Sequence, residues 1–251
     1  MILKFLGSGS AFTMNNYQTN MILMKGNRKF LIDAGSDIRF SLRDANLSYK
    51  DITDVYISHL HADHAGGLEY LAFCTFFDPA CSKPNLWISK ALSESLWQNV
   101  LSGGLGSIQN RIMKLNDYFD VKEIDQNESI YWNDIKMTPI QVVHIMDGFN
   151  IRPSFGLMIN RGNKKIFITT DTQFNPNQIV DFYKSADLIF QDCETTAFKS
   201  GVHANYSELL TLPNEIKKKM WLCHYQEKSA WMTTKKDGFK GFVLQGQEFK
   251  I

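Results

Sequence analysis

The 251-residue sequence has no apolar run long enough to cross a membrane. The longest run, residues 70–77, contains Thr75 and falls far short of the roughly 20 residues that a transmembrane helix needs. The first residues, Met1 to Gly7, read as a strand that ends at a glycine and lack the basic, apolar and small-residue segments of a signal peptide. We therefore expect a soluble protein with no membrane partner.

Cysteine and proline are also scarce, with 4 and 6 residues respectively. The cysteines are too widely spaced for a disulfide framework, and none forms the CxxC pair of a structural zinc site. With 44% hydrophobic residues, the composition is that of a globular protein, which excludes disorder and low-complexity repeats. A reducing cytoplasm is the expected location.

The sequence has no excess of charge of one sign. It contains 27 Lys and Arg against 26 Asp and Glu, a formal net charge of +1. This balance argues against a surface built to coat nucleic acid or anionic lipid. The two basic clusters, 217–219 and 235–236, are typical of solvated faces.

Short apolar segments alternating with helical patterns predict an α/β fold. The expected strands cover residues 1–6, 19–25, 29–33, 54–58, 135–143, 155–159, 165–169, 187–191 and 219–223. The expected helices cover residues 36–45, 68–77, 91–101, 176–184 and 205–210, the third ending at a glycine pair. No linker divides the chain, so we expect a single domain over residues 1–251, a two-sheet sandwich with a structured insertion near 73–120.

The segment His59-Leu60-His61-Ala62-Asp63-His64 holds three of the six histidines of the chain. Alternate residues of an extended segment point the same way, so His59 and His61 can aim their imidazoles at one point. Asp63 and His64 follow at a turn into the next helix. Imidazole and carboxylate ligands suit zinc and neighbouring metals, and the end of a strand is where an α/β fold presents a site. The segment therefore predicts a metal site.

Three further candidate ligands each come directly after an apolar strand. They are His144, Asp171 and His224. A single His or Asp in this position is usually a cap or a turn residue. The repeated placement instead indicates that all three are delivered to the same sheet edge as the first cluster and complete its site.

The HxHxDH segment with the later His, Asp and His resembles the metallo-β-lactamase superfamily, from Leu6-Gly7-Ser8-Gly9-Ser10 to His224. The resemblance implies an α/β fold, the αββα four-layer sandwich of two β-sheets with helices on the outer faces. The second half is similar to the ribonuclease Z-like phosphodiesterase branch. That branch carries a glutamate after a strand and then a histidine before a hydroxyl-rich helix start, and Glu194 and His203 are the matching positions.

The resemblance also implies a hydrolase with two Zn²⁺ ions, with Mn²⁺ or another divalent metal as the alternative. The implied ligands are His59, His61 and His144 for one ion, Asp63, His64 and His224 for the second, and Asp171 as the bridge. The histidine at the second position of the HxHxDH segment, His61, favours zinc over iron, because the di-iron members of the superfamily generally have glutamate at that position. Two ions about 3.5–4 Å apart would convert water to an attacking hydroxide near neutral pH and clamp a phosphoryl oxygen.

The same resemblance implies catalytic roles for three residues. Asp63 lies at the metal centre. His203 would stabilise the charge of the transition state or protonate the leaving oxygen, and Glu194 would orient His203.

The expected substrate is a small phosphodiester of a nucleotide: a cyclic nucleotide, a cyclic oligonucleotide or an RNA 3′ end. Ribonuclease Z usually has a basic exosite arm for tRNA, and this sequence has no such insertion, so a large RNA is not the expected substrate. Phe149 and Phe155 flank the expected loop 146–153 after His144 and are candidates for stacking on a base. Arg152 is the candidate for contact with a phosphate.

Two other functions stay open at this stage. The same metals could hydrolyse a thioester or a lactone, which has no evident need for Glu194 and His203. A non-catalytic member of the fold could bind a ligand without cleaving it, although such members often lack one or more of the ligands. A homodimer is a further open alternative.

Overall fold

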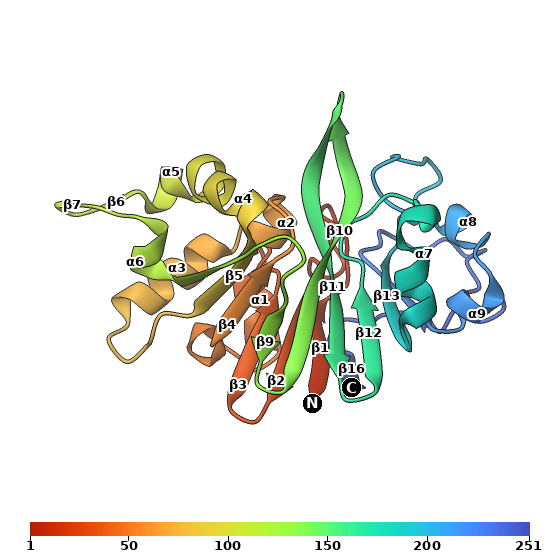
Figure 1. Ribbon diagram of the computed structural model, residues 1–251, viewed down its shortest axis with the longest axis horizontal. Helices are drawn as coiled ribbons and strands as arrows, with labels where there is room; N and C mark the ends of the chain where they lie inside the picture. The colour runs from red at the N-terminus through yellow and green to blue at the C-terminus, as the bar shows by residue number, and fades with distance from the viewer. The chain divides into compact units, whose positions relative to one another are not determined.

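Two seven-stranded sheets organise the chain, and each belongs to its own structural unit (Figure 1). The computed structural model describes residues 1–251. Unit 1 comprises residues 1–7, 16–126 and 245–251, and unit 2 comprises residues 8–15 and 127–244. Each sheet mixes parallel and antiparallel strands, so the expected α/β class with two sheets is confirmed. The single-domain boundary of 1–251 stays a prediction.

The sheet of unit 1 begins as an antiparallel meander and continues as parallel strands. In spatial order its strands are β16 (Glu248–Lys250), β1 (Ile2–Gly7), β2 (Asn20–Lys25), β3 (Arg28–Ile32), β4 (Asp54–Ile57), β5 (Asn85–Ser89) and β8 (Asp120–Ile124). All residues of β4 are buried, as befits a parallel strand covered on both faces. This burial explains why Val55, Tyr56 and Ile57 of β4 form an apolar run.

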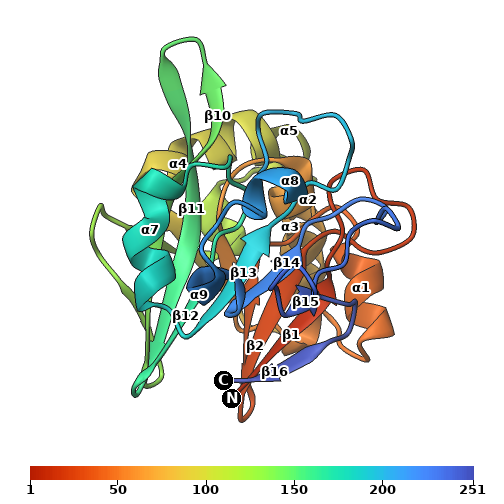
Figure 2. The same cartoon turned by 90° about the vertical axis from the view of Figure 1, so that its right-hand side faces the viewer.

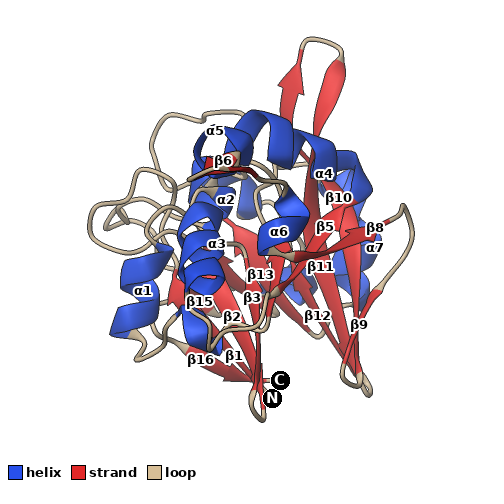
Figure 3. Cartoon of the chain, turned by 90° about the vertical axis from the view of Figure 1, so that its left-hand side faces the viewer, coloured by secondary structure: helices blue, strands red, loops and turns tan.

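The helices of unit 1 follow its strands, and Figure 3 shows α1, α3 and α6 in front of the sheet. They are α1 (Ile38–Asp44), η1 (Tyr49–Asp51), α2 (Ala62–Ala65), α3 (Leu68–Phe77), α4 (Lys90–Ser95), η2 (Leu96–Leu101), α5 (Ser102–Leu105) and α6 (Leu115–Tyr118), with the small hairpin β6 (Ser107–Ile108) and β7 (Arg111–Ile112). The expected helix end at Gly103-Gly104 is wrong, because both glycines lie inside α5.

The sheet of unit 2 also joins an antiparallel half to a parallel half. In spatial order its strands are β15 (Gly241–Phe242), β14 (Met220–Cys223), β13 (Leu188–Asp192), β12 (Lys164–Ile168), β11 (Asn150–Arg161), β10 (Ile135–Asp147) and β9 (Ile130–Trp132). The expected loop 146–153 is wrong, since β10 and β11 run on as a long projecting hairpin (Figure 1). Gly148, with φ of 68°, supplies the tight two-residue turn that a hairpin of this kind requires.

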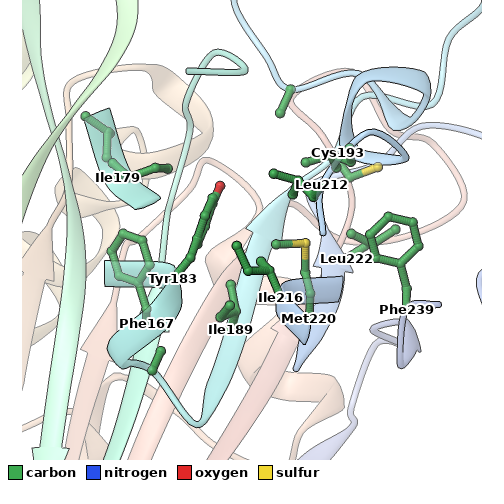
Figure 4. Packing of buried hydrophobic residues seen from close by; sticks show 14 of the residues in the cluster. Phe167, Ile179, Tyr183, Ile189, Cys193, Leu212, Ile216, Met220, Leu222 and Phe239 are labelled. Atoms are coloured by element: carbon green, nitrogen blue, oxygen red, sulfur yellow. The ribbon is translucent and has the colours of Figure 1, made fainter. Parts of the chain in front are cut away.

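Three helices pack on unit 2, and its apolar core lies beneath them. They are α7 (Pro176–Ser185), α8 (Tyr206–Leu209) and α9 (Asn214–Lys217), seen in Figure 2. Figure 4 shows Phe167 of β12 and Tyr183 of α7 among the buried side chains of this core. The Tyr183 hydroxyl is satisfied by donating to Oε1 of Gln191 at 2.5 Å. No helix in either unit combines the length and apolarity that crossing a bilayer requires.

The packing around Phe167 predicts how much this side chain contributes to the stability of unit 2. The ring is fully buried, and its centroid lies 5.7 Å from that of Phe182 and 6.0 Å from that of Tyr183. We expect Phe167→Ala to lower the free energy of unfolding by about 3–5 kcal/mol, because it leaves a cavity. Urea unfolding followed by circular dichroism measures this loss. Tyr131→Ala, at an exposed position of β9, should change it by less than about 0.5 kcal/mol, and equal losses would contradict the expectation.

Candidate active site

The HxHxDH segment of unit 1 follows β4 and places its four candidate ligands as two neighbouring pairs. Nε2 of His59 lies 3.1 Å from Nδ1 of His61. Nε2 of His64 lies 3.2 Å from Oδ2 of Asp63. His59, Asp63 and His64 are buried, whereas His61 is exposed. The structure therefore brings the four side chains together in unit 1, as the spacing predicts.

Asp33 at the end of β3 orients two of these histidines, and sequence reasoning missed it. Its carboxylate accepts the N–H and the hydroxyl of Ser58, each at 2.8 Å, and lies 2.8 Å from Nδ1 of His64. Oγ of Ser58 is in turn 3.1 Å from Nδ1 of His59. A proton held on each Nδ1 leaves the Nε2 lone pair of both histidines ready for a metal ion. The signal was present, because Asp33 also follows an apolar strand.

Unit 2 brings together the three later candidates, as the sequence predicts. Nε2 of His224 lies 3.4 Å from Oδ1 of Asp171, and Nε2 of His144 lies 3.8 Å from its Oδ2. All three residues are buried. Thr170 and His224 have φ angles of 52° and 60°, so strained left-handed backbone turns the chain at the ends of β12 and β14.

His144 does not follow a strand but lies within β10, at a bulge. Val143 pairs with Pro153 and Ile145 with Arg152, so His144 is the extra residue of the ladder. A bulge bends the strand and redirects a side chain, which accounts for the position of this histidine. Its Nδ1 lies 2.8 Å from the carbonyl oxygen of Val202, which again leaves Nε2 as the nitrogen for a metal.

Asp192, at the end of β13, holds His203, and this corrects the expectation that Glu194 does so. Nδ1 of His203 lies 2.8 Å from Oδ2 of Asp192, and Nδ1 of His224 lies 3.3 Å from the other oxygen. The Glu194 carboxylate instead accepts the backbone N–H of Ser200 at 3.0 Å. Glu194 therefore fixes the loop that leads to His203. Asp192 was missed although it ends an apolar strand, as Asp33 does.

Burial and neighbouring charges shift the pKa values of these side chains in opposite directions. Burial would lower the pKa of His203, but the Asp192 carboxylate outweighs it and raises that pKa. Burial would raise the pKa of Asp192, and the charge and hydrogen bond of His203 lower it overall. For His144, burial dominates and lowers the pKa, which favours the neutral imidazole that can ligate a metal.

The donor atoms fit a divalent metal ion. Two ligand atoms that are each about 2.0–2.1 Å from a tetrahedral zinc ion lie roughly 3.3 Å apart. The pairs within the units, at 3.1 Å for His59 and His61, 3.2 Å for Asp63 and His64 and 3.4 Å for Asp171 and His224, match this edge length. Their chemistry, imidazole nitrogen with carboxylate oxygen, is the one that zinc and manganese accept.

The three candidates for substrate contact lie along the β10–β11 hairpin. Phe149 is at its turn with a fully exposed ring, and Phe155 lies on β11 opposite Gln141. Arg152 forms an ion pair with Asp147 of the facing strand. Arg152 is therefore neutralised in this structure, and contact with a phosphate would have to compete with Asp147.

The role of Asp33 leads to a prediction about metal binding. In Asp33→Asn the side-chain oxygen can still accept from Ser58, but the amide NH₂ would face Nδ1 of His64 and move the imidazole proton to Nε2. We expect zinc affinity to fall about 10- to 100-fold, as for other partners of metal ligands. Competition with a chromogenic chelator measures it. Asn tolerates the φ of 62° at this position, and Asp120→Asn on exposed β8 is the control. Unchanged affinity in Asp33→Asn would refute the role.

Solved structures share this fold. The metallo-beta-lactamase fold protein YhfI from Bacillus subtilis has a TM-score of 0.75 and 16% identity, covering 99% of this chain and 99% of its own. The short form of human tRNase Z has a TM-score of 0.72 and 17% identity, covering 100% and 99%. The metallo-β-lactamase fold that the resemblance implies is thus confirmed. The gathered His and Asp side chains are of the types that can hold a metal ion.

Sequence comparison gives a narrower family. The anti-Pycsar protein Apyc1 from Paenibacillus sp. (strain J14) is 36% identical over 228 residues, which cover 90% of this chain and 89% of that protein. The family model described as anti-Pycsar protein Apyc1 matches residues 1–249. The chain therefore belongs to the anti-Pycsar protein Apyc1 family.

Proposed function

We propose that the protein is a metal-dependent phosphodiesterase that hydrolyses a cyclic nucleotide. In this proposal His59, His61 and His144 hold one Zn²⁺ ion, Asp63, His64 and His224 hold the second, and Asp171 bridges them. The orientation of His59, His64 and His144 supports this ligand set, because other groups hold their Nδ1 atoms. When bound, the two ions would supply an activated water and a clamp on the phosphoryl oxygens.

The position of His203 carries the proposal that the reaction is phosphodiester hydrolysis. Its side chain is 17% exposed, against 2% for His144 and 3% for His224. The ring lies 4.9 Å from both of those imidazoles, centroid to centroid. Because Asp192 holds Nδ1, Nε2 is the atom that can face a substrate beside the proposed metal ligands.

From this position His203 would act as a general acid. The Asp192 carboxylate raises the pKa of His203, which favours the protonated ring. Nε2–H would first donate a hydrogen bond to the phosphoryl group and then pass its proton to the oxygen of the breaking P–O bond. Asp192 would accept the Nδ1–H hydrogen bond and hold the ring in place before and after the transfer, and Asp63 would hold the attacking water in place. Carbonyl substrates such as thioesters and lactones have less need for such an acid.

The family supports a cyclic nucleotide over the other phosphodiesters. The name anti-Pycsar of the relatives is consistent with the degradation of cyclic nucleotides. The net charge of +1 also fits a small substrate better than a long RNA. Phe149, Phe155 and Arg152 stay candidates for substrate contact, with Arg152 exchanging Asp147 for a phosphate oxygen.

Removal of metal is the first test of the proposal. We expect dialysis against a chelator to abolish hydrolysis of cyclic ribonucleotides, and Zn²⁺ or Mn²⁺ to restore it. Chromatography of the nucleotide products measures the activity, and elemental analysis counts the metal ions. A protein that binds two metal ions but cleaves none of the cyclic ribonucleotides would contradict the proposed function. Preferential cleavage of a thioester or a lactone would replace it.

His203 provides the second test. We expect His203→Ala to keep its metal content and to lose about 10²- to 10⁴-fold in kcat, as for removal of a general acid. Asp192→Asn should lower kcat in the same direction, because an amide facing Nδ1 favours the wrong tautomer. Lys122→Ala, on the exposed edge strand β8, is the matched control and should retain full activity. A fully active His203→Ala would rule out the proposed acid.

A further inference from the structure

Three loops of unit 2 expose large aromatic side chains. The exposed fractions are 89% for Phe12, 79% for Phe198 and 55% for Trp231. One exposed apolar residue is ordinary in a folded protein, but a group of them marks a binding surface. Burial in the fold does not explain the presence of these rings.

Hydrogen bonds connect the three loops to one another at residues 225–227. The N–H of Ser10 donates to the carbonyl of Tyr225 at 3.1 Å. The N–H of Thr195 donates to Oε1 of Gln226 at 3.1 Å. Farther along the first loop, Nδ2 of Asn15 donates to Oε1 of Glu227 at 3.1 Å. The loops that carry Phe12, Phe198 and Trp231 therefore adjoin one another.

The same loops are anchored to residues of the candidate active site. The N–H of His224 donates to the carbonyl of Ser8 at 2.9 Å, four residues before Phe12. The loop of Phe198 leads from β13 to His203 (Figure 2), and its Val202 carbonyl contacts His144. Phe198 and Trp231 are thus close in sequence to His203 and His224, and the loop of Phe12 is hydrogen-bonded to His224.

Local contacts hold the three aromatic residues in place. Phe12 lies in a tight turn that the N–H of Thr13 closes on the carbonyl of Ser10 at 3.2 Å, at a position where small polar residues are preferred. The carbonyl of Phe198 accepts the Thr196 hydroxyl at 2.6 Å. The Trp231 ring packs edge-on against Tyr206 at 5.4 Å. The exposed rings are therefore carried by ordered loops.

Two lysines of these loops, Lys199 and Lys228, have partners within the fold. Nζ of Lys199 pairs with Oε1 of Glu208 at 3.4 Å. Nζ of Lys228 lies over the rings of Tyr225 and Phe242 at 5.2 Å and 5.5 Å from their centroids. The exposed rings of Phe12, Phe198 and Trp231 are apolar and flat, which suits the face of a base.

We propose that Phe12, Phe198 and Trp231 form an aromatic rim that stacks on the base of the substrate. This inference rests on the proposed function. In a cyclic mononucleotide only the sugar separates the base from the phosphate, so a base held at the rim would hold the phosphate one sugar away. Stacking reads the faces of bases and not their edges, so the rim selects substrates that carry a base while tolerating both purines and pyrimidines.

Substitutions at the rim test this inference. Stacking on an aromatic side chain contributes about 1–3 kcal/mol per base, which corresponds to a factor of about 5 to 150. We expect Phe198→Ala and Phe12→Ala each to raise KM for cyclic ribonucleotides by a factor in this range, with kcat within about threefold. The larger surface of purines should make their KM rise more than that of pyrimidines. Phe198→Tyr should restore the original KM.

The controls distinguish a failure of the rim proposal from a failure of the proposed function, and test whether the surface has another role. Tyr131→Ala removes an equally exposed ring from β9, the opposite edge of the same sheet, and should leave KM unchanged. If the unmodified protein cleaves no cyclic nucleotide, the proposed function fails. If it does and the Phe198 and Phe12 variants keep their KM, only the rim fails. Light scattering completes the test, since a changed oligomeric state with unchanged KM would assign the rim to contact between copies.

Discussion

The carboxylate of Asp192 is the group on which the geometry of unit 2 depends. It is buried, and an isolated charge there would be strongly destabilising. The structure compensates with Nδ1 of His203 at 2.8 Å, Nδ1 of His224 at 3.3 Å and the N–H of Thr172 at 2.9 Å. One side chain thereby orients a proposed acid and a proposed metal ligand, and couples both to the turn after β12. Removing that charge would disturb all of these groups together.

Asp33 repeats this arrangement in unit 1. It also ends a strand beside a parallel neighbour, and it accepts a backbone N–H, a hydroxyl and an imidazole. In a parallel sheet the carboxyl ends of adjacent strands lie at one edge, so an Asp on one strand can reach a histidine that follows the next. Both units therefore use a buried carboxylate to fix the tautomer of a histidine. This explains why Asp33 and Asp192, which lie outside the proposed ligand set, belong to the site.

Much of this site could be predicted from the sequence, because chain order and proximity to a strand end fix most of it. The pairs within the HxHxDH segment follow from local spacing, and Asp171 and His224 from the ends of β12 and β14. The role given to Glu194 was wrong because proximity in the sequence to His203 does not decide which carboxylate faces its ring. His144 was placed after a strand because a bulge leaves no mark in an apolar pattern. The long β10–β11 hairpin was missed for a related reason, since Met146 to Pro153 carries turn residues although its ladder continues.

Three residues in or beside the candidate active site have strained backbone conformations. Asp33, Thr170 and His224 all have left-handed φ angles, which cost non-glycine residues on the order of 1–3 kcal/mol each. Glycine would relieve the strain at these positions but would remove the carboxylate of Asp33 and the imidazole of His224. Each strained residue directly follows a strand or directly precedes a proposed ligand. The sharp turns place functional side chains at the ends of buried strands. The packing of the apolar cores of the two units offsets the free-energy cost of these strained turns.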